Sequence, residues 1–400
     1  MFLGLAAMFA LIIWAPSVFG VPAGQKDGLN PYADGRTLSA NGDKFKIVLF
    51  SDLHYGERGT NNSWVKWADE ADAKSTEVMR KALADEHPDF VVYGGDQVTG
   101  ENTFYNVTGH QNHLLQPVLE TKTRFCSIFG NHDESYNVSH ISSYLHEKDV
   151  APELSWTQRV VESAADPKGQ FNYFIPLWAD KSQAPAAVLW FFDSRSGVHY
   201  SGEFGIKNEP WLALDWVDPQ AATWINNTAD AMRKEWGTLP PALVFVHIPP
   251  VLATPISKEV AERPDDFPGI NFDPKPDTQG DAKGKFWHRT DPSHPWWAAV
   301  SGTLGADDGL LGVISGHDHG DDWCGRAESA GPYTFCYARH TGYGGYGTWA
   351  RGSRVFEFST KGGALDGLRT WIRMEDHSAA NTTTLAEGGK AVLRNSRDAP

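Results

Sequence analysis

Five short stretches of this sequence place aspartate, histidine and asparagine at spacings that suit a metal site. Gly95, Gly130 and Gly316 lie in or beside them and would let the backbone turn sharply or approach an ion closely. The side chains offer oxygen and imidazole donors without a thiolate, which favours zinc, iron or manganese over a cysteine-based structural zinc centre. The stretches are Asp52-Leu53-His54, Gly95-Asp96, Asn131-His132-Asp133, His247 and His317-Asp318-His319.

The candidate donors suit a pair of metal ions. Seven of them exceed one four-coordinate shell, so the pattern favours two ions about 3.5 to 4 Å apart that share one carboxylate. Such a pair supports phosphoryl displacement, in which a metal-activated water attacks phosphorus in line. The chain has 35 Lys and Arg against 50 Asp and Glu, a formal net charge of −15, which disfavours nucleic-acid binding. The positive charge that a phosphate ester requires would therefore come from the ions.

Each polar stretch follows a short apolar run with the length and composition of a buried β-strand. Open α/β sheets build their sites at the carboxyl ends of strands, so the five stretches are expected to meet at one edge. Because side chains repeat every second residue in extended backbone, Asp52 and His54 should point to one side, as should His317 and His319. The predicted strands are residues 46–50, 90–93, 125–129, 187–192, 243–246, 310–314, 333–338, 354–358 and 368–372.

Helix-compatible segments separate the strands, which indicates an α/β fold. Apolar residues at helical spacing predict helices over residues 64–87 and 219–236. Residues 249–295 are rich in proline, aspartate and glycine, and we interpret them as an insertion beside a site. We predict a single domain without a strong internal boundary. Its parts are a leader over residues 21–42, the domain over 43–375 and a flexible tail over 376–400.

The N-terminus has the features of a secretory signal peptide over residues 1–20. An uncharged apolar run over residues 2–14 leads to small residues and predicts cleavage near Gly20, with an uncleaved signal anchor as the alternative. No later stretch predicts a membrane span in the mature chain. Acceptor sequences for N-linked glycans begin at Asn61, Asn106, Asn137, Asn226 and Asn381, which fits a secreted or vacuolar glycoprotein.

The three cysteines divide into a candidate pair and a single thiol. Cys324 and Cys336 flank a turn signal at Gly331-Pro332 and could close a disulfide loop. Cys126 lies in an apolar run and is expected to be a buried free thiol.

The ordered motifs DLH, GGD, GNHD, VFVH and GHDH resemble those of the calcineurin-like metallophosphoesterase superfamily. They run from Asp52 to His319, and five in order make the resemblance specific. It implies a two-sheet sandwich flanked by helices, an α/β/β/α arrangement, and metal-dependent hydrolysis of phosphate esters. Within the superfamily, DLHYGE, GGDQVTG and RHTGYGGYG are similar to the fungal and plant inactive or short purple acid phosphatase-like group.

The resemblance also implies a role for each matching residue. His132 would touch the substrate oxygen beside Asn131 and protonate or stabilise the leaving group, with Asp133 orienting it. Purple enzymes resemble this pattern except for a tyrosine ligand three residues after the bridging aspartate, where this chain has Thr99. No purple charge-transfer band is therefore expected, and the identity of the metals is left open between iron, zinc and manganese. The implied ligands are Asp52, His54 and His319 for one ion, Asn131, His247 and His317 for the other, and Asp96 as the bridge.

Several alternatives stay open at this point. The leading hypothesis is a phosphomonoesterase for small-molecule phosphate esters, and the rivals are a phosphodiesterase or nucleotide-cleaving enzyme and a non-catalytic metal-binding protein. The intact His132 argues against the last. Asp133 could instead cap a helix near Glu134. Tyr343 and Tyr346 could wall a pocket, or the glycines around them only make turns. Asp193 is interpreted as structural or as a support for the ligands.

Overall fold

The computed structural model describes most of the chain. It covers residues 29–32, 34–40, 42–57, 68–103, 106–135, 138–159, 171–199, 211–212, 214–280 and 295–395. The predicted signal peptide, two of the five glycan acceptors and residues 281–294 of the predicted insertion lie outside the described residues.

One sheet has seven strands in the order β16-β15-β14-β13-β2-β3-β4. Strands β2, β3 and β4 run parallel, and β13 pairs antiparallel with β2. Alternate residues of β2 enter different cores: Ile47 and Leu49 face the other sheet, while Val48 and Phe50 face the helices. The bounds are β2 Lys44–Phe50, β3 Phe90–Gly94, β4 Arg124–Ile128, β13 Gly352–Lys361, β14 Ala364–Met374, β15 Ala379–Glu387 and β16 Lys390–Asn395.

The other large sheet also has seven strands, in the order β1-β5-β6-β9-β10-β12-β11. It packs against the first sheet through an apolar core in which Phe245 of β9 meets Phe356 of β13 at 5.8 Å between ring centroids. A further two-stranded pairing joins β7 and β8. The bounds are β1 Leu38–Ser39, β5 Tyr173–Trp178, β6 Ala187–Phe192, β7 Val198–His199, β8 Trp211–Leu212, β9 Ala242–Val246, β10 Leu310–Ser315, β11 Cys324–Gly325 and β12 Phe335–Tyr337.

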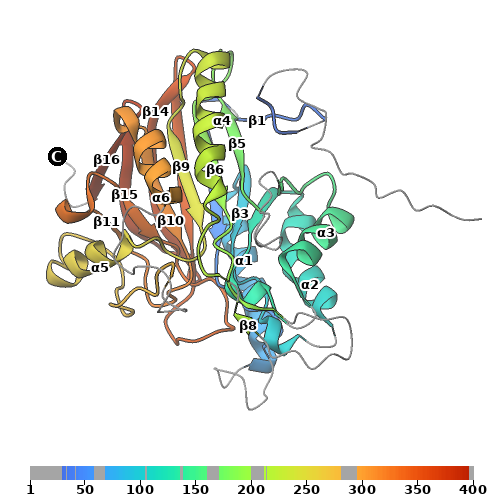
Figure 1. The fold of residues 1–400 in the computed structure, drawn as a ribbon. Coiled ribbons are helices and arrows are strands. Elements are labelled where there is room, and N and C mark those ends of the chain that lie inside the picture. Colours follow the sequence, from blue (N-terminus) through green and yellow to red (C-terminus); the bar gives the residue numbers. More distant parts are fainter. Residues whose placement is uncertain are drawn as a thin grey trace, which may run out of the picture.

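Helices cover the outer faces of both sheets, which confirms the predicted α/β/β/α sandwich (Figure 1). Helices α1 and α2 pack on the β2-β3-β4 face, with α3 beside α2, and helices α4, α5 and α6 pack on the other sheet. Their bounds are α1 Ala68–Glu86, α2 Val107–Thr121, α3 His140–Val150, α4 Gln220–Trp236, α5 Ala253–Glu262 and α6 Pro295–Ala299. Single turns lie at η1 Gly100–Asn102, η2 Asn131–Asp133, η3 Val300–Leu304, η4 Ala306–Asp308 and η5 Glu328–Ala330.

The predicted tail over residues 376–400 is wrong as far as residue 395. Strands β15 and β16 extend the first sheet, and Leu385 is fully buried in the core between the sheets. The stretch reads as polar because threonine, alanine and asparagine dominate strands near the edge of the sheet, where much of one face meets solvent. The leader is also not separate, since β1 pairs with β5 and buries Leu38.

Three further sequence predictions can be compared with the fold. The disulfide between Cys324 and Cys336 is present and joins β11 to β12, and Cys126 is a buried free thiol. Both predicted helices form, although the described part of the first begins at residue 68. None of the described helices combines the length and apolarity needed to cross a bilayer.

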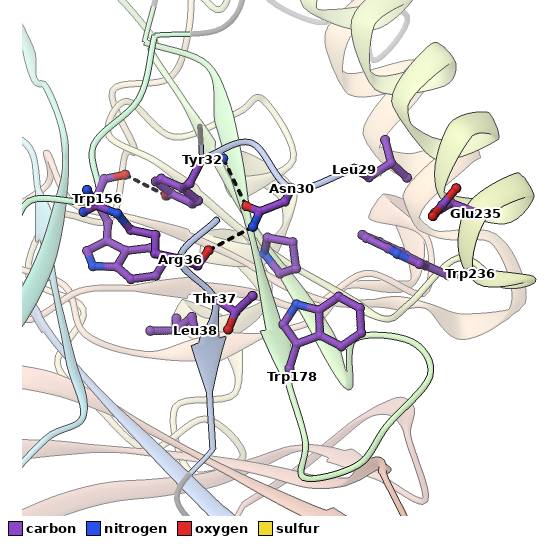
Figure 2. A pocket seen from close by; sticks show the side chains of 11 residues that line it. Leu29, Asn30, Tyr32, Arg36, Thr37, Leu38, Trp156, Trp178, Glu235 and Trp236 are labelled. Atoms are coloured by element: carbon purple, nitrogen blue, oxygen red, sulfur yellow. Dashed lines mark hydrogen bonds between the residues drawn. The ribbon is translucent and has the colours of Figure 1, made fainter. Parts of the chain in front are cut away.

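A cavity of about 180 Å³ lies beside β1 and the end of α4 (Figure 2). Trp156, Trp178 and Trp236 line it together with Arg36, which stacks over the Trp156 ring at 5.3 Å. None of the predicted metal ligands contributes to its lining. Three of the 16 tryptophans of the chain therefore line this cavity.

Candidate metal centre

The loops after five strands meet at one edge of the sandwich, as the sequence predicts. Strands β2, β3 and β4 of one sheet deliver Asp52, His54, Asp96 and Asn131, while β9 and β10 of the other sheet deliver the remaining ligands. Two groups of side chains have ligand atoms within 4.8 Å of one another, and both contain Asp96. These groups are Asp52, His54, Asp96 and His319, and Asp96, His247 and His317.

The backbone conformation that brings the ligands together differs from the one predicted. Extended backbone was expected to align Asp52 with His54, but both have positive φ, 56° and 49°, as do Asp96 at 48° and His317 at 76°. This left-handed region is unfavourable for residues with a side chain, by about 1 to 2 kcal/mol each. The backbone therefore turns through the left-handed region after β2, β3 and β10, and the surrounding fold maintains the strain at these four ligands.

Two glycines permit the close approach of these loops. A Cβ at Gly95, which has φ +96°, would collide with the ring of His247, and a Cβ at Gly130 would collide with Asp96 Oδ1. Both positions therefore exclude a side chain because a predicted metal ligand occupies the space.

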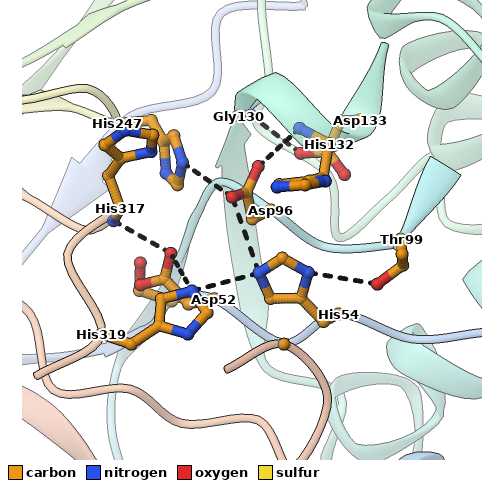
Figure 3. A network of polar contacts seen from close by, with 12 residues as sticks. Asp52, His54, Asp96, Thr99, Gly130, His132, Asp133, His247, His317 and His319 are labelled. Atoms are coloured by element: carbon orange, nitrogen blue, oxygen red, sulfur yellow. Dashed lines mark hydrogen bonds and ion pairs between the residues drawn. The ribbon is translucent and has the colours of Figure 1, made fainter. Parts of the chain in front are cut away.

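The cluster is compact and buried (Figure 3). Asp96 Oδ2 lies 3.1 Å from His247 Nε2 and 3.6 Å from His54 Nε2. His54 Nε2 lies 3.2 Å from His319 Nε2, which lies 3.7 Å from Asp52 Oδ1. The central position of Asp96 between the two groups fits the bridging role implied by the resemblance.

Contacts at Nδ1 orient three of the imidazoles. His247 Nδ1 donates to Gly94 O at 2.9 Å, and His319 Nδ1 donates to Tyr346 O at 2.9 Å. His54 Nδ1 lies 3.1 Å from Thr99 Oγ1. With Nδ1 engaged in each ring, Nε2 faces the cluster, and this is how proteins fix the tautomer of a metal-ligating histidine.

The donor set fits metal ions. Asp52 Oδ2 and Asn131 Oδ1 are buried oxygens without a hydrogen-bond partner among the described residues. A buried acceptor with no partner is unfavourable, and a cation bound beside each of these atoms would satisfy it. Asn131 also lies in a loop tied to the bridge, because the His132 backbone N–H donates to Asp96 Oδ1 at 2.8 Å. The Asp/His cluster could therefore hold two metal ions.

The electrostatics of the site favour a charged bridge. Burial raises the pKa of Asp96, but His247, His132 and His54 outweigh it and hold the pKa well below its usual value. Burial lowers the pKa of His247, but the Asp96 charge outweighs burial and raises it to about 9. Burial also lowers the pKa of His54 well below its usual value. Asp96 is thus ionised at neutral pH and ready to bind cations.

The structure corrects the role of Asp133. Its Oδ1 accepts from the backbone N–H groups of Gln97 and Val98 at 2.9 and 3.0 Å, and its Oδ2 accepts from Gly130 N at 2.8 Å. Asp133 thus caps the turn η2 and ties it to the loop after β3. The capping alternative is also not met as stated, because none of the described helices begins near Glu134 and α3 begins at His140. The contact that orients His132 comes from another residue.

That other residue is Glu101, which sequence reasoning missed. Glu101 Oε1 lies 2.7 Å from His132 Nδ1. Burial lowers the pKa of His132, but Asp96 and Glu101 together outweigh burial and raise it to about 9. Glu101 lies five residues after Asp96 on the turn η1, and nothing in that spacing marks it as a partner of His132.

Thr99 stands where the resemblance places a tyrosine ligand in purple enzymes. Its hydroxyl donates to the buried Glu57 at 3.1 Å and accepts from His54 Nδ1. The residue therefore supports a ligand through hydrogen bonds. Glu57 completes this series of hydrogen bonds and is a second supporting residue that the motifs did not reveal.

The three remaining candidates, Tyr346, Tyr343 and Asp193, have different roles in the structure. Tyr346 stacks on His319 with ring centroids 4.0 Å apart, so it walls the metal cluster. Tyr343 instead donates its hydroxyl to Glu375 at 2.6 Å. Asp193 is buried and ion-pairs with His140 at 3.4 Å, as a structural residue.

Comparisons with known proteins agree with this geometry. A family model described as calcineurin-like phosphoesterase matches residues 45–321. The chain is 28% identical over 388 residues to the "Probable inactive purple acid phosphatase 14" of Arabidopsis thaliana, covering 88% of this chain and 86% of that protein. It is 27% identical to the phosphatase DCR2 of Saccharomyces cerevisiae over 203 residues, covering 47% of this chain and 34% of that protein.

A solved structure has the same fold. The crystal structure of a dimetal phosphatase from Danio rerio aligns with a TM-score of 0.51 at 15% identity, covering 86% of this chain and 99% of that one. At this identity the likeness concerns the fold alone.

Proposed function

Because the chain belongs to the calcineurin-like phosphoesterase family, we propose that it hydrolyses phosphomonoesters with the help of two metal ions. One observation carries the proposal: the two donor groups share Asp96, and His132 stands beside them with its ring centroid 4.9 Å from that of His54. A metal cluster alone would suit a binding protein. A cluster with an oriented imidazole at its rim suits an ester hydrolase.

The ligands divide as the motifs imply. Asp52, His54 and His319 would hold one ion, Asn131, His247 and His317 would hold the other, and Asp96 would contribute to both shells. When bound, the ions activate water and neutralise the phosphoryl oxygens. Asn131 is the second residue we assign to substrate contact, because it adjoins His132 in the same turn.

His132 acts on the leaving group. Its Nδ1 is held by Glu101, so we assign Nε2 to the ester oxygen, where it delivers a proton to the departing alkoxide. The His132 side chain is 23% exposed, whereas His54 and His247 are almost fully buried, so of these three imidazoles it is the one that a substrate can reach.

The word inactive in the name of the Arabidopsis relative makes turnover the central question. All seven predicted ligands and His132 are present in this chain, and these supports favour catalysis over metal binding without turnover. The test is metal analysis of purified protein, combined with hydrolysis of an aryl phosphate and its matching diester before and after chelation.

We expect two ions per chain, hydrolysis of the monoester and loss of activity with chelator. Activity should return when zinc, iron or manganese is added. Protein with two ions and no activity on any phosphate ester would defeat the proposal, and faster hydrolysis of the diester would favour the phosphodiesterase alternative.

We also propose a secreted or vacuolar, glycosylated protein. The supports are the apolar N-terminus and the acceptor sequences, of which Asn106, Asn226 and Asn381 lie among the described residues. Asn381 is the weakest acceptor, because its Nδ2 donates to Asp322. A mass shift on treatment with a glycosidase would test glycosylation, and N-terminal sequencing would test cleavage near Gly20.

A further inference from the structure

Two exposed aromatic side chains lie together close to the metal cluster. Among the described residues, the large apolar side chains that are exposed are Phe272 at 58%, Leu145 at 58% and Tyr346 at 37%. Phe272 stacks on Trp349 with centroids 5.9 Å apart and planes inclined by 13°, and Trp349 meets Tyr346 edge to face at 6.2 Å. We call Phe272, Trp349 and Tyr346 the aromatic platform.

The platform adjoins the metal ligands directly. Tyr346 stacks on His319 at 4.0 Å with planes inclined by 9°, and its hydroxyl accepts from the His319 backbone N–H at 2.9 Å. His319 in turn lies 3.2 Å from His54 at the centre of the cluster. The platform is therefore joined to the metal cluster through Tyr346, with Trp349 and then Phe272 extending outward from it.

The exposed position of Phe272 is held by the fold. Its backbone N–H donates to Gly320 O at 2.9 Å, while Asp273 Oδ2 accepts from Gly320 N at 2.7 Å and from the Tyr346 hydroxyl at 2.8 Å. Asp273 N donates to Asp321 Oδ1 at 3.1 Å. These bonds fix the segment to the loop that carries His317 and His319, yet the phenyl ring stays in solvent.

Trp349 is also fixed. Gly347 has φ +94°, and a Cβ there would collide with the indole ring, so the ring lies against the glycine backbone. A rigid aromatic surface left exposed beside a reaction site is typical of a ligand-binding wall, because binding would remove apolar area from water without ordering a loop.

The charged side chains near the platform restrict the kind of leaving group that can bind there. Asp273 accepts from the Tyr346 hydroxyl, and Oδ2 of the exposed Asp277 lies 3.7 Å from His317 Nε2, so two carboxylates lie on this side of the metal cluster. The guanidinium of Arg351, which donates to the carbonyls of Gly347 and Trp349, is buried. A second negative charge on the leaving group would be repelled there, whereas an uncharged ring would stack.

Resting on the proposed function, we propose that Phe272 and Trp349 form a subsite for the aromatic ring of a phosphomonoester whose leaving alcohol is uncharged. The metal ligands would hold the phosphoryl end of the substrate through the ions, His132 protonates the leaving oxygen, and the platform selects the alcohol. Tyr346 joins the subsite to His319. Phe272 and Trp349 are specificity residues in this assignment, and the chemical step needs neither of them.

The test compares 2-phenylethyl phosphate with butyl phosphate, whose leaving groups are both primary alcohols. We expect Phe272→Ala and Trp349→Ala to lower the ratio of kcat/KM for the phenylethyl over the butyl ester by about three- to tenfold, the value of one aromatic stack. Phe272→Trp should restore the ratio. Leu145→Ala, which removes an equally exposed apolar side chain from α3, should leave the ratio unchanged.

A binding measurement separates this inference from the proposed function. Calorimetry with 2-phenylethylphosphonate and butylphosphonate on the metal-loaded protein reports the same preference without turnover. If wild type hydrolyses neither of these two alkyl esters, the phosphonate Kd ratio still decides the subsite, and the proposed function is decided separately by the assay on the aryl phosphate. Equal ratios in wild type, Phe272→Ala and Trp349→Ala, by either method, would overturn the subsite.

Discussion

His132 Nδ1 lies 2.7 Å from Glu101 Oε1, and this contact joins the turn after β4 to the turn after β3. The carboxylate fixes the imidazole so that Nε2 is assigned to the substrate. Glu101 is thus a positioning residue, whose effect on turnover should pass through His132.

The contact predicts coupled losses of activity. Glu101→Gln should lower kcat about tenfold or more, while His132→Ala should lower it by about 10² to 10⁴, the usual contribution of a general acid. In the His132→Ala background, Glu101→Gln should change kcat by less than about twofold. Glu120→Gln, which removes a carboxylate paired with Arg80 on the surface, is the matched control. Additive losses in the double variant would show that Glu101 acts elsewhere.

Replacing Thr99 should change the affinity of the site for metal. Thr99→Val keeps the shape of the side chain but removes the hydroxyl that orients His54, so the affinity for metal should fall about 10- to 100-fold. A chelator titration followed by metal analysis would measure this. Thr99→Ser keeps the hydroxyl and should stay near wild type. Equal retention of metal by the valine variant would show that the contact with His54 has no such role.

Replacing His247 should change the number of metal ions bound per chain. His247→Ala removes a ligand of one shell only, so metal content should drop from two ions to one per chain and kcat should collapse. His110→Ala is the control, because that imidazole pairs with Asp72 outside the two donor groups. Activity that survives with both metals bound would refute the ligand assignment.

His140 predicts a dependence of stability on pH. Burial lowers its pKa, but Asp193 and Glu134 outweigh burial and raise it from 6.5 to about 10. Its stabilising effect is complete below about pH 6.5 and is lost as pH rises towards 10, by about 1.4 kcal/mol per pH unit.

Urea unfolding of wild type and His140→Gln measures this effect. The difference in free energy of unfolding between them should shrink from about pH 7 to about pH 10, while contributions from other titrating groups cancel. Parallel stability curves across that range would contradict the assignment of a charged, buried His140.

The sequence determined the framework of the protein. Apolar runs ending in Asp, His and Asn identified the five strands that carry the candidate site, because strand periodicity and donor chemistry are local properties. The seven candidate ligands followed from the motifs through the family resemblance. Some elements were not predicted because their composition does not favour the structure they form. Strand β5 contains Pro176, helix α2 contains Gly109 and Pro117, and strands β15 and β16 are polar. In each case tertiary packing overrides the local preference.

Only the tertiary structure decided which residues support the ligands. Glu101 reaches His132 across two loops, Asp133 turns to backbone amides, and Asp273 is brought to Tyr346 from 73 positions away in the chain. The left-handed backbone at Asp52 and His54 likewise replaces the extended geometry that spacing suggests. A ligand type is encoded locally, whereas its orientation depends on contacts between distant loops, which no single stretch of sequence contains.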